Sequence, residues 1–267
     1  VYLPMPIPPE YEHFKATVGD WLDVAPLDFR GASVTIPHKQ NLLRFVKESD
    51  GRIEPLAEAI GAANTLTRSQ AGSLYASNTD YAAALDSVCH AMDTRRDGLR
   101  GVPVAVIGAG GAARAIVAGF AGHGADVTVH NRTLVKAEQL AAEFSRREDS
   151  DGRTYGPVGA AELDDLAASS PRVVINCTPL GMHPETDATP VPEIPDAWGE
   201  RTVIFDTIYN PVETRLVREA KAAGCRTVSG VEMFVRQGAA QFELWTRRPA
   251  PVDVFRNVLL KQLGSQT

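Results

Sequence analysis

The middle of the chain alternates continuous apolar runs with stretches of helical periodicity. The apolar runs have the length and composition of strands buried on both faces, and they cover residues 102–107, 126–130, 172–177 and 202–206. Helical stretches follow at 112–121, 134–146 and 214–223, and a further short strand is expected at 226–229. This order predicts a doubly wound parallel sheet with right-handed crossovers.

The segments on either side of this alternation are less regular. In the first block, helices are expected at 10–24, 38–48 and 52–60. A short strand followed by a turn is expected at 31–37, and further short strands at 63–66 and 73–76. A helix at 81–93 leads into the middle region, and helices at 232–245 and 252–263 end the chain. We expect these last helices to pack back on the first block. The α/β chain then divides into one domain of residues 1–80 and 230–267 and another of residues 81–229.

Composition narrows the function classes. The 267 residues are 44% hydrophobic and 22% charged, as in a soluble globular protein, and the net charge of -6 provides no general attraction to nucleic acid or anionic membranes. The sequence contains no apolar run long enough to span a bilayer. Cys89, Cys177 and Cys225 lie far apart, which predicts neither a disulfide framework nor a metal site and is typical of a reducing, cytoplasmic compartment.

The run that ends at Ile107 continues into a glycine-rich turn and then a helix. This turn has the spacing of a Rossmann dinucleotide-binding site, with its backbone N–H groups and the helix dipole facing the pyrophosphate. Gly108 permits the tight turn, Gly110 lets backbone approach the phosphates, and Ala113 packs helix on strand. The predicted cofactor contacts are Gly108, Ala109, Gly110, Gly111, Ala112 and Ala113. An empty doubly wound fold is the alternative.

The end of the next strand favours NADP over NAD. An NAD site usually has an acidic residue there to bind the ribose 2′-hydroxyl, but this strand ends in Asn131, Arg132 and Thr133. The Arg132 guanidinium can pair with a 2′-phosphate, Thr133 can donate a hydrogen bond, and Lys136 adds charge one turn later. The alternative is a solvated arginine at the end of a strand.

Candidate reactive groups lie in the first block. Lys39 follows a short strand and a proline turn, and its ammonium could stabilise a developing alkoxide and protonate it. Asp80 could pair with Lys39 and orient it, although Asn, Thr and Asp at 78–80 also suit a helix cap. Asn64 could hold a substrate hydroxyl through its amide or could stabilise a turn.

Eight motifs in order along the chain resemble those of shikimate dehydrogenases. They are Gly-x-Ser-Val-Thr-x-Pro-x-Lys (31–39), Gly-Ala-x-Asn-Thr (61–65), Asn-Thr-Asp (78–80), Gly-Ala-Gly-Gly-Ala-Ala-Arg (108–114), Asn-Arg-Thr (131–133), Asn-Cys-Thr-Pro-Leu-Gly-Met (176–182), Asp-Thr-Ile-Tyr-Asn-Pro (206–211) and the segment 230–245. The resemblance implies a substrate-binding domain (1–80 and 230–267) and a Rossmann NADP-binding domain (81–229).

The resemblance also implies an activity and a role for each matching residue. The reaction is the reversible NADPH-dependent reduction of 3-dehydroshikimate to shikimate, with hydride exchanged between the nicotinamide C4 and the ring C3. Lys39 and Asp80 match the catalytic pair. The residues that match substrate-binding positions are Thr35, Asn64, Gln237 and Tyr209, and those that wall the nicotinamide are Thr178, Met182, Gly230 and Met233.

Some alternatives within the family stay open. A quinate dehydrogenase of relaxed specificity differs by one hydroxyl of its substrate, and a non-catalytic NADP sensor on the same fold is a further possibility that Lys39 and Asp80 argue against. The chain starts after the position of the family's Ser-x-Ser motif, which binds the substrate carboxylate, so we expect that residues once preceded Val1. A fusion to a dehydroquinate dehydratase and a monomeric or homodimeric state are also compatible with the sequence.

Overall fold

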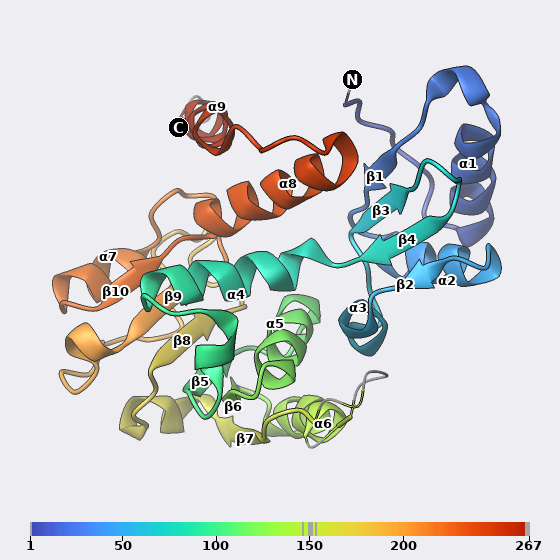
Figure 1. The fold of residues 1–267 in the computed structure, drawn as a ribbon. Helices are drawn as coiled ribbons and strands as arrows, with labels where there is room; N and C mark the ends of the chain where they lie inside the picture. The colour runs from blue at the N-terminus through green and yellow to red at the C-terminus, as the bar shows by residue number, and fades with distance from the viewer. Residues whose placement is uncertain (1, 146, 149–151, 153, 265–267) are drawn as a thin grey trace. The chain divides into compact units, whose positions relative to one another are not determined.

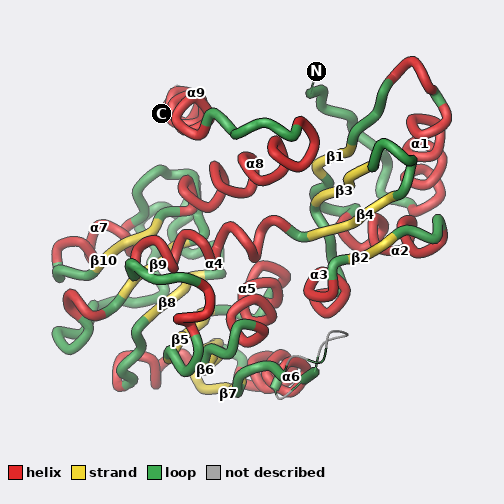
Figure 2. The backbone as a smooth tube through the Cα atoms, in the orientation of Figure 1, coloured by secondary structure: helices red, strands yellow, loops and turns green. Residues whose placement is uncertain are grey.

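The computed structural model describes residues 2–145, 147–148, 152 and 154–264. The chain forms two compact units, and both Figure 1 and Figure 2 show their elements. Unit 1 comprises Val1–Thr79 and Ala240–Pro249, and unit 2 comprises Asp80–Ala239 and Ala250–Thr267.

Unit 1 is a small mixed sheet covered by helices. Its helices are α1 (Tyr11–Asp23), η1 (Ala25–Leu27), α2 (Lys39–Glu48) and α3 (Pro55–Ile60), and its strands are β1 (Gly31–Ser33), β2 (Arg52–Ile53), β3 (Thr65–Arg68) and β4 (Leu74–Ser77). The strand order is β1-β3-β4-β2. The β1–β3 and β3–β4 pairs are antiparallel, whereas β2 and β4 are parallel.

The core of unit 1 lies between α1, α2 and the sheet. Leu42, Phe45 and Val46 recur at helical spacing on α2 and are buried against Phe14 of α1 and Leu66 of β3. The rings of Phe14 and Phe45 meet edge to face with centroids 6.1 Å apart. This packing fixes α2, and therefore the position of its first residue, Lys39.

Unit 2 is a parallel sheet with helical crossovers. Its strands are β5 (Pro103–Ile107), β6 (Asp126–Asn131), β7 (Val158–Glu162), β8 (Val173–Asn176), β9 (Val203–Asp206) and β10 (Arg226–Val228). Its longer helices are α4 (Thr79–Ala91), α5 (Gly111–Gly122), α6 (Leu134–Phe144), α7 (Arg215–Ala222), the first part of α8 (Gly230–Thr246) and α9 (Val252–Gly264). Short helices lie at η2 (Arg96–Leu99), η3 (Leu163–Ala168) and η4 (Gly199–Arg201).

The strand order of unit 2 defines its ligand edge. The order is β10-β9-β8-β5-β6-β7, with parallel pairs throughout these strands. Successive strands run outward in one direction from β5 and in the other from β8, so the topological switch point lies between β5 and β8. Ligands of such sheets bind beyond the carboxyl ends of the strands at that point. The predicted α/β class and Rossmann-type sheet are confirmed.

The observed elements differ from the predictions in a few places. The predicted helix at 52–60 is wrong at its start, where Arg52–Ile53 pair with β4 and the helix begins only at Pro55. Proline suits a first helical position because it has no N–H to satisfy there. Strand β7 was not predicted, and the predicted helix end at 146 lies outside the described residues.

The C-terminal elements divide differently from the predicted domains. Helix α9 packs on the start of α8, where Leu263 of α9 lies in one cluster with Val231 and Val235 of α8. These three residues belong to unit 2. Only residues 240–249 group with the first block, where Trp245 Nε1 donates a 2.9 Å hydrogen bond to the Leu66 carbonyl. As a functional division, the predicted boundaries at 80 and 230 stay a prediction.

Candidate active site

The glycine turn of unit 2 exposes the beginning of α5. The helix starts at Gly111, its N-cap Gly110 has no side chain to cap it, and its first turn contains no acidic residue. Gly108 has φ 104°, a left-handed conformation that favours glycine, and a Cβ at Gly110 or Gly111 would meet nothing within 4 Å. The bare helix end therefore offers backbone N–H groups and a positive dipole end to an anion.

The ends of β5 and β6 bring the predicted phosphate residues beside this turn. Ile107 pairs with His130, and the Gly108 N–H donates to the His130 carbonyl over 2.8 Å. Asn131, Arg132 and Thr133 follow directly. Asn131 Nδ2 closes the turn on the Thr133 carbonyl at 2.8 Å.

The end of β6 has the chemistry of a site for a phosphorylated ribose. Arg132, Thr133 and Lys136 are exposed, and within the described residues neither basic side chain forms an ion pair with a carboxylate. Thr133 is the N-cap of α6, yet its hydroxyl makes no cap hydrogen bond and is available to a ligand. These groups and the glycine turn fit NADP.

The loop after β8 places Thr178 against the glycine turn. A Cβ built on Gly108 would lie 3.1 Å from Thr178 Cγ2, so the two segments touch. Asn176, the last residue of β8, holds Thr178 because its Oδ1 accepts from the Thr178 N–H at 2.9 Å and from Thr178 Oγ1 at 2.7 Å. The structure thus brings together two residues that the sequence predicts at the cofactor.

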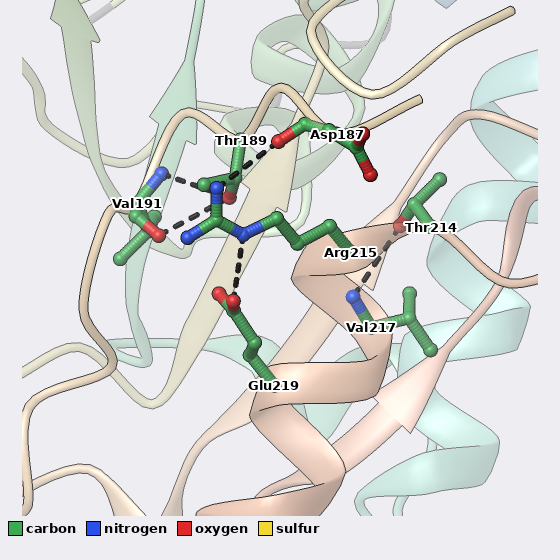
Figure 3. Close-up of polar contacts among 7 residues, drawn as sticks. All are labelled: Asp187, Thr189, Val191, Thr214, Arg215, Val217 and Glu219. Atoms are coloured by element: carbon green, nitrogen blue, oxygen red, sulfur yellow. Dashed lines mark hydrogen bonds and ion pairs between the residues drawn. The ribbon is translucent and has the colours of Figure 1, made fainter. Parts of the chain in front are cut away.

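A later part of the same loop forms a hydrogen bond with the first residue of α7. Met182 is 46% exposed and lies five residues before Asp187, whose carbonyl accepts from Arg215 at 3.1 Å. Arg215 is itself held by Glu219 one turn along α7, at 2.6 Å, as Figure 3 shows. Arg215 therefore limits the movement of the segment that follows Met182.

The loop after β9 meets the beginning of α8. The Gly230 N–H donates to the Ile208 carbonyl at 3.2 Å, and a Cβ at Gly230 would lie 2.4 Å from that oxygen, so only glycine fits there. Tyr209 is 44% exposed, with its ring centroid 5.2 Å from that of Phe234. Met233 is half-buried on the same turn of α8. Tyr209, Gly230 and Met233 therefore occupy adjoining segments.

In unit 1, Asn64 is a buried hydrogen-bonding centre. Its Oδ1 accepts from the Thr79 N–H at 2.8 Å, from Thr79 Oγ1 at 3.2 Å and from Thr65 Oγ1 at 2.7 Å. Its backbone N–H donates to the Ser77 carbonyl at 3.1 Å, and its own carbonyl accepts from the Val34 N–H at 2.7 Å. The turn role considered for Asn64 is therefore present, and the amide Nδ2 is the group that remains for a substrate.

Lys39 and Asp80 are each linked to Asn64 through a neighbouring residue. The Lys39 carbonyl accepts from the Ala63 N–H at 3.0 Å, and Ala63 is the residue before Asn64. Asp80 follows Thr79, which Asn64 holds, and it lies in the first turn of α4, where a carboxylate is favoured by the helix dipole. Asn64 thus holds the residue before Asp80, and its neighbour Ala63 binds the backbone of Lys39. A direct contact between their side chains stays a prediction.

The residues around Lys39 fix the start of α2. His38 is buried and stacks on Phe14, with its Nε2 3.1 Å from the Ile7 carbonyl and its Nδ1 3.0 Å from the Asn41 amide. Thr35 is exposed, and its carbonyl accepts from the His38 N–H at 2.8 Å. The predicted hydroxyl-binding side chain of Thr35 is therefore accessible on the turn that leads to Lys39.

The structure identifies three supporting residues to which the sequence analysis gave no role. Gln241 is buried and donates to Thr65 Oγ1 at 2.9 Å and to the Asn64 carbonyl at 3.3 Å, whereas the predicted Gln237 is only half-buried on α8. Asn176 and Asp206 are fully buried at the ends of β8 and β9. A polar residue that ends an apolar run was the available signal for these two.

Comparison with known proteins agrees with this geometry. Three family models match: the shikimate dehydrogenase substrate binding domain at residues 2–66, shikimate / quinate 5-dehydrogenase at 91–170, and the shikimate 5'-dehydrogenase C-terminal domain at 230–260. The shikimate dehydrogenase (NADP(+)) of Methanocella arvoryzae is 42% identical over 248 residues, which cover 91% of this chain and 81% of that protein.

A second relative and a solved structure extend the comparison. The shikimate dehydrogenase (NADP(+)) of Methanosarcina mazei is 41% identical over 244 residues, covering 91% of this chain and 82% of that protein. The chain belongs to the shikimate dehydrogenase family. The crystal structure of shikimate 5-dehydrogenase from Thermus thermophilus in complex with NADP(H) and shikimate is similar at 30% identity and a TM-score of 0.73, covering 94% of this chain and 84% of that one.

The family assignment predicted from the eight motifs is confirmed. Thr35, Lys39 and Asn64 fall within the stretch that matches the shikimate dehydrogenase substrate binding domain, and Gly230 and Met233 fall within the matched C-terminal domain. Within the described residues, no group of three His, Cys, Asp or Glu side chains could hold a metal ion. In the same part of the chain, no helix has the length and apolar character needed to cross a bilayer.

Proposed function

We propose that this protein catalyses the reversible NADPH-dependent reduction of 3-dehydroshikimate to shikimate. The observation that carries the proposal is the Asn64 centre in a chain that belongs to this family. Asn64 holds the residue before Asp80, and the N–H of the neighbouring Ala63 binds the Lys39 carbonyl. The function and the NADP cofactor predicted from sequence agree with the NADP-dependent relatives.

Lys39 and Asp80 supply the acid–base chemistry in this proposal. The Lys39 ammonium donates a hydrogen bond to the ketone oxygen, stabilises the alkoxide that develops there and protonates it. Asp80 orients the ammonium, and Lys39 regains its proton from solvent after each turnover. Thr35, the Nδ2 of Asn64 and Gln237 hold the ring hydroxyls, and Tyr209 lies beside the ring.

The cofactor is held by unit 2. When bound, NADPH supplies the hydride for the ketone carbon. The bare start of α5 faces the pyrophosphate, Arg132, Thr133 and Lys136 hold the 2′-phosphate, and Asn131 shapes that turn. Thr178, Met182, Gly230 and Met233 form the wall against the nicotinamide.

An absorbance assay at the NADPH band tests the proposed reaction. We expect shikimate-dependent reduction of NADP and a higher kcat/KM for shikimate than for quinate. A higher kcat/KM for quinate would favour the relaxed-specificity alternative. Binding of NADP without turnover of either acid would favour a sensor and contradict the proposal.

The exposed guanidinium at the end of β6 should decide cofactor choice. We expect Arg132→Ala to raise the KM for NADPH about 10- to 100-fold, because charge-assisted hydrogen bonds to a phosphate are worth about 1.5–3 kcal/mol. The KM for NADH should change little, since NADH has no 2′-phosphate. The matched control is Arg218→Ala, which removes another exposed arginine of unit 2. A wild-type preference for NADH, or an R132A variant with unchanged NADPH kinetics, would contradict this assignment.

The remaining assignments belong to the same proposal. We expect residues 1–80 and 230–267 to serve substrate binding and residues 81–229 to serve NADP binding. A cytoplasmic location and a monomeric or homodimeric state also stay predictions.

A further inference from the structure

A buried polar network joins the carboxyl ends of β8 and β9. Asn176 and Asp206 are the last residues of these strands, they lie opposite each other in the parallel register, and both are fully buried. Asn176 Nδ2 donates to Asp206 Oδ1 at 3.0 Å. The network therefore begins on β8, one of the two strands that flank the switch point of the sheet.

Asp206 accepts hydrogen bonds from three directions. Besides the Asn176 amide, the Ile208 N–H donates to Oδ1 at 3.1 Å and Thr214 Oγ1 donates to Oδ2 at 2.7 Å. Thr214 is the N-cap of α7, where its Oγ1 also accepts from the Val217 N–H at 3.3 Å (Figure 3). The carboxylate thus ties together the end of β8, the loop after β9 and the start of α7.

The burial of this carboxylate is unusual for a purely structural group. Burial raises the pKa of Asp206, while its three donors act in the opposite direction. Among the described residues no basic side chain forms an ion pair with it. Burying a carboxyl group without a cation is costly. Its presence at the carboxyl ends of the strands, where sheets of this type bind ligands, therefore indicates a role beyond stability.

The network reaches both loops of the proposed cofactor wall. Through Asn176 it holds the N–H and hydroxyl of Thr178, and Asn176 Nδ2 lies 3.4 Å from the Leu180 carbonyl, two residues before Met182. Through Ile208 it holds the segment on which Gly230 packs. Thr207 adds a second link, because its Oγ1 donates to the Asn176 carbonyl at 2.8 Å.

We propose that Asp206 is a positioning residue, which sets the loops after β8 and β9 so that Thr178, Met182 and Gly230 meet the nicotinamide correctly. This inference rests on the proposed function. Asp206 is fully buried, so in this proposal it acts through Asn176, Ile208 and Thr214. The glycine turn and Arg132 bind the phosphates independently of this network, so its loss should affect turnover more than affinity.

The first test compares Asp206→Ala with Asp206→Asn. D206A removes both acceptor oxygens, and we expect kcat to fall about 10- to 100-fold, because a small misplacement of reacting groups has effects of that size. The Kd for NADPH, measured by isothermal titration calorimetry, should stay within about threefold. D206N keeps one oxygen for the Asn176 amide and the Ile208 N–H, so it should recover most of the lost kcat.

A buried hydrogen bond at the other end of β9 gives the matched control. Thr202 is buried, and its Oγ1 donates to the Pro171 carbonyl at 2.9 Å. Thr202→Val should lower thermal stability and leave kcat per folded protein unchanged. Unchanged kcat in D206A, a comparable loss of kcat in T202V, or a large rise in the NADPH Kd of D206A would each overturn the inference. A wild-type protein without turnover would instead reject the proposed function.

A second pair of variants covers the case in which D206A does not fold. Thr214→Val removes the hydroxyl that donates to Asp206 Oδ2, whereas Thr214→Ser retains it along with the helix cap. We expect T214V to lower kcat about threefold or more, and T214S to match the wild type. Equal kcat values in the two variants would overturn the inference.

Discussion

Replacing Lys39 with alanine should reduce kcat by about a hundredfold to ten-thousandfold, the range that a positioned general acid contributes. The Kd values for NADPH and shikimate should change little, because the proposed function assigns the phosphates to unit 2 and the ring hydroxyls to other side chains. The loss arises because no ammonium remains to stabilise and protonate the alkoxide. Steady-state kinetics and calorimetry measure the two effects separately.

A lysine on the same helix is the matched control for Lys39. Lys47 lies at the other end of α2, is 65% exposed and pairs with Glu58 at 2.6 Å. Lys47→Ala should keep wild-type kcat and change the unfolding free energy by about 0.5 kcal/mol or less, since exposed ion pairs contribute little. Near-normal turnover in K39A would remove Lys39 from the mechanism.

Substitution of Asn64 should damage both stability and catalysis. Asn64→Ala leaves the Thr79 N–H without its acceptor in a buried place, so the unfolding free energy should fall by about 1–3 kcal/mol. The start of α4 then loses its anchor beside Asp80, and kcat/KM for shikimate should fall about a hundredfold. Urea denaturation and steady-state kinetics provide the two measurements.

Asn64→Asp separates the two functions of this side chain. The aspartate keeps an acceptor for the Thr79 N–H and Thr65 Oγ1 but has no amide N–H for a ring hydroxyl. We expect the KM for shikimate to rise about 3- to 10-fold, the size of one hydrogen bond. The unfolding free energy should also fall, because the new carboxylate is buried at this position. An unchanged KM for shikimate in N64D would contradict the role of the Asn64 amide in substrate binding.

Patterns in the sequence predict the elements that depend on local burial. The apolar runs before Gly108 and before Asn131 belong to central strands with both faces covered, and the structure contains strands at both places. Strand β7 has no such pattern, because Gly159 and the alanines after it have weak strand preference. Its pairing with β6 from Val127 to Asn131 determines its conformation, and sequence periodicity does not contain that long-range information.

The candidate site likewise combines features that are local in the sequence with contacts between residues far apart in it. The turn at Gly108 could be predicted, because it is a local feature of known spacing, and Arg132 could be named as a candidate from the missing carboxylate beside it. By contrast, Asn64 binds Thr79, which is 15 residues away in the sequence, and Asp206 binds Asn176, which is 30 residues away. No local sequence rule specifies such distant partners. The motifs therefore identify these residues but do not predict which residues they contact.

The most direct test of the central claim is a double-mutant cycle on kcat for Lys39→Ala, Asp80→Ala and the combined variant. If the two residues act as one acid–base unit, the fold-decreases in kcat of the single variants should not multiply in the double variant. The double variant should then have about the same kcat as K39A alone. If the losses multiply, or if D80A turns over like the wild type, Lys39 and Asp80 do not work together and the proposed mechanism is wrong.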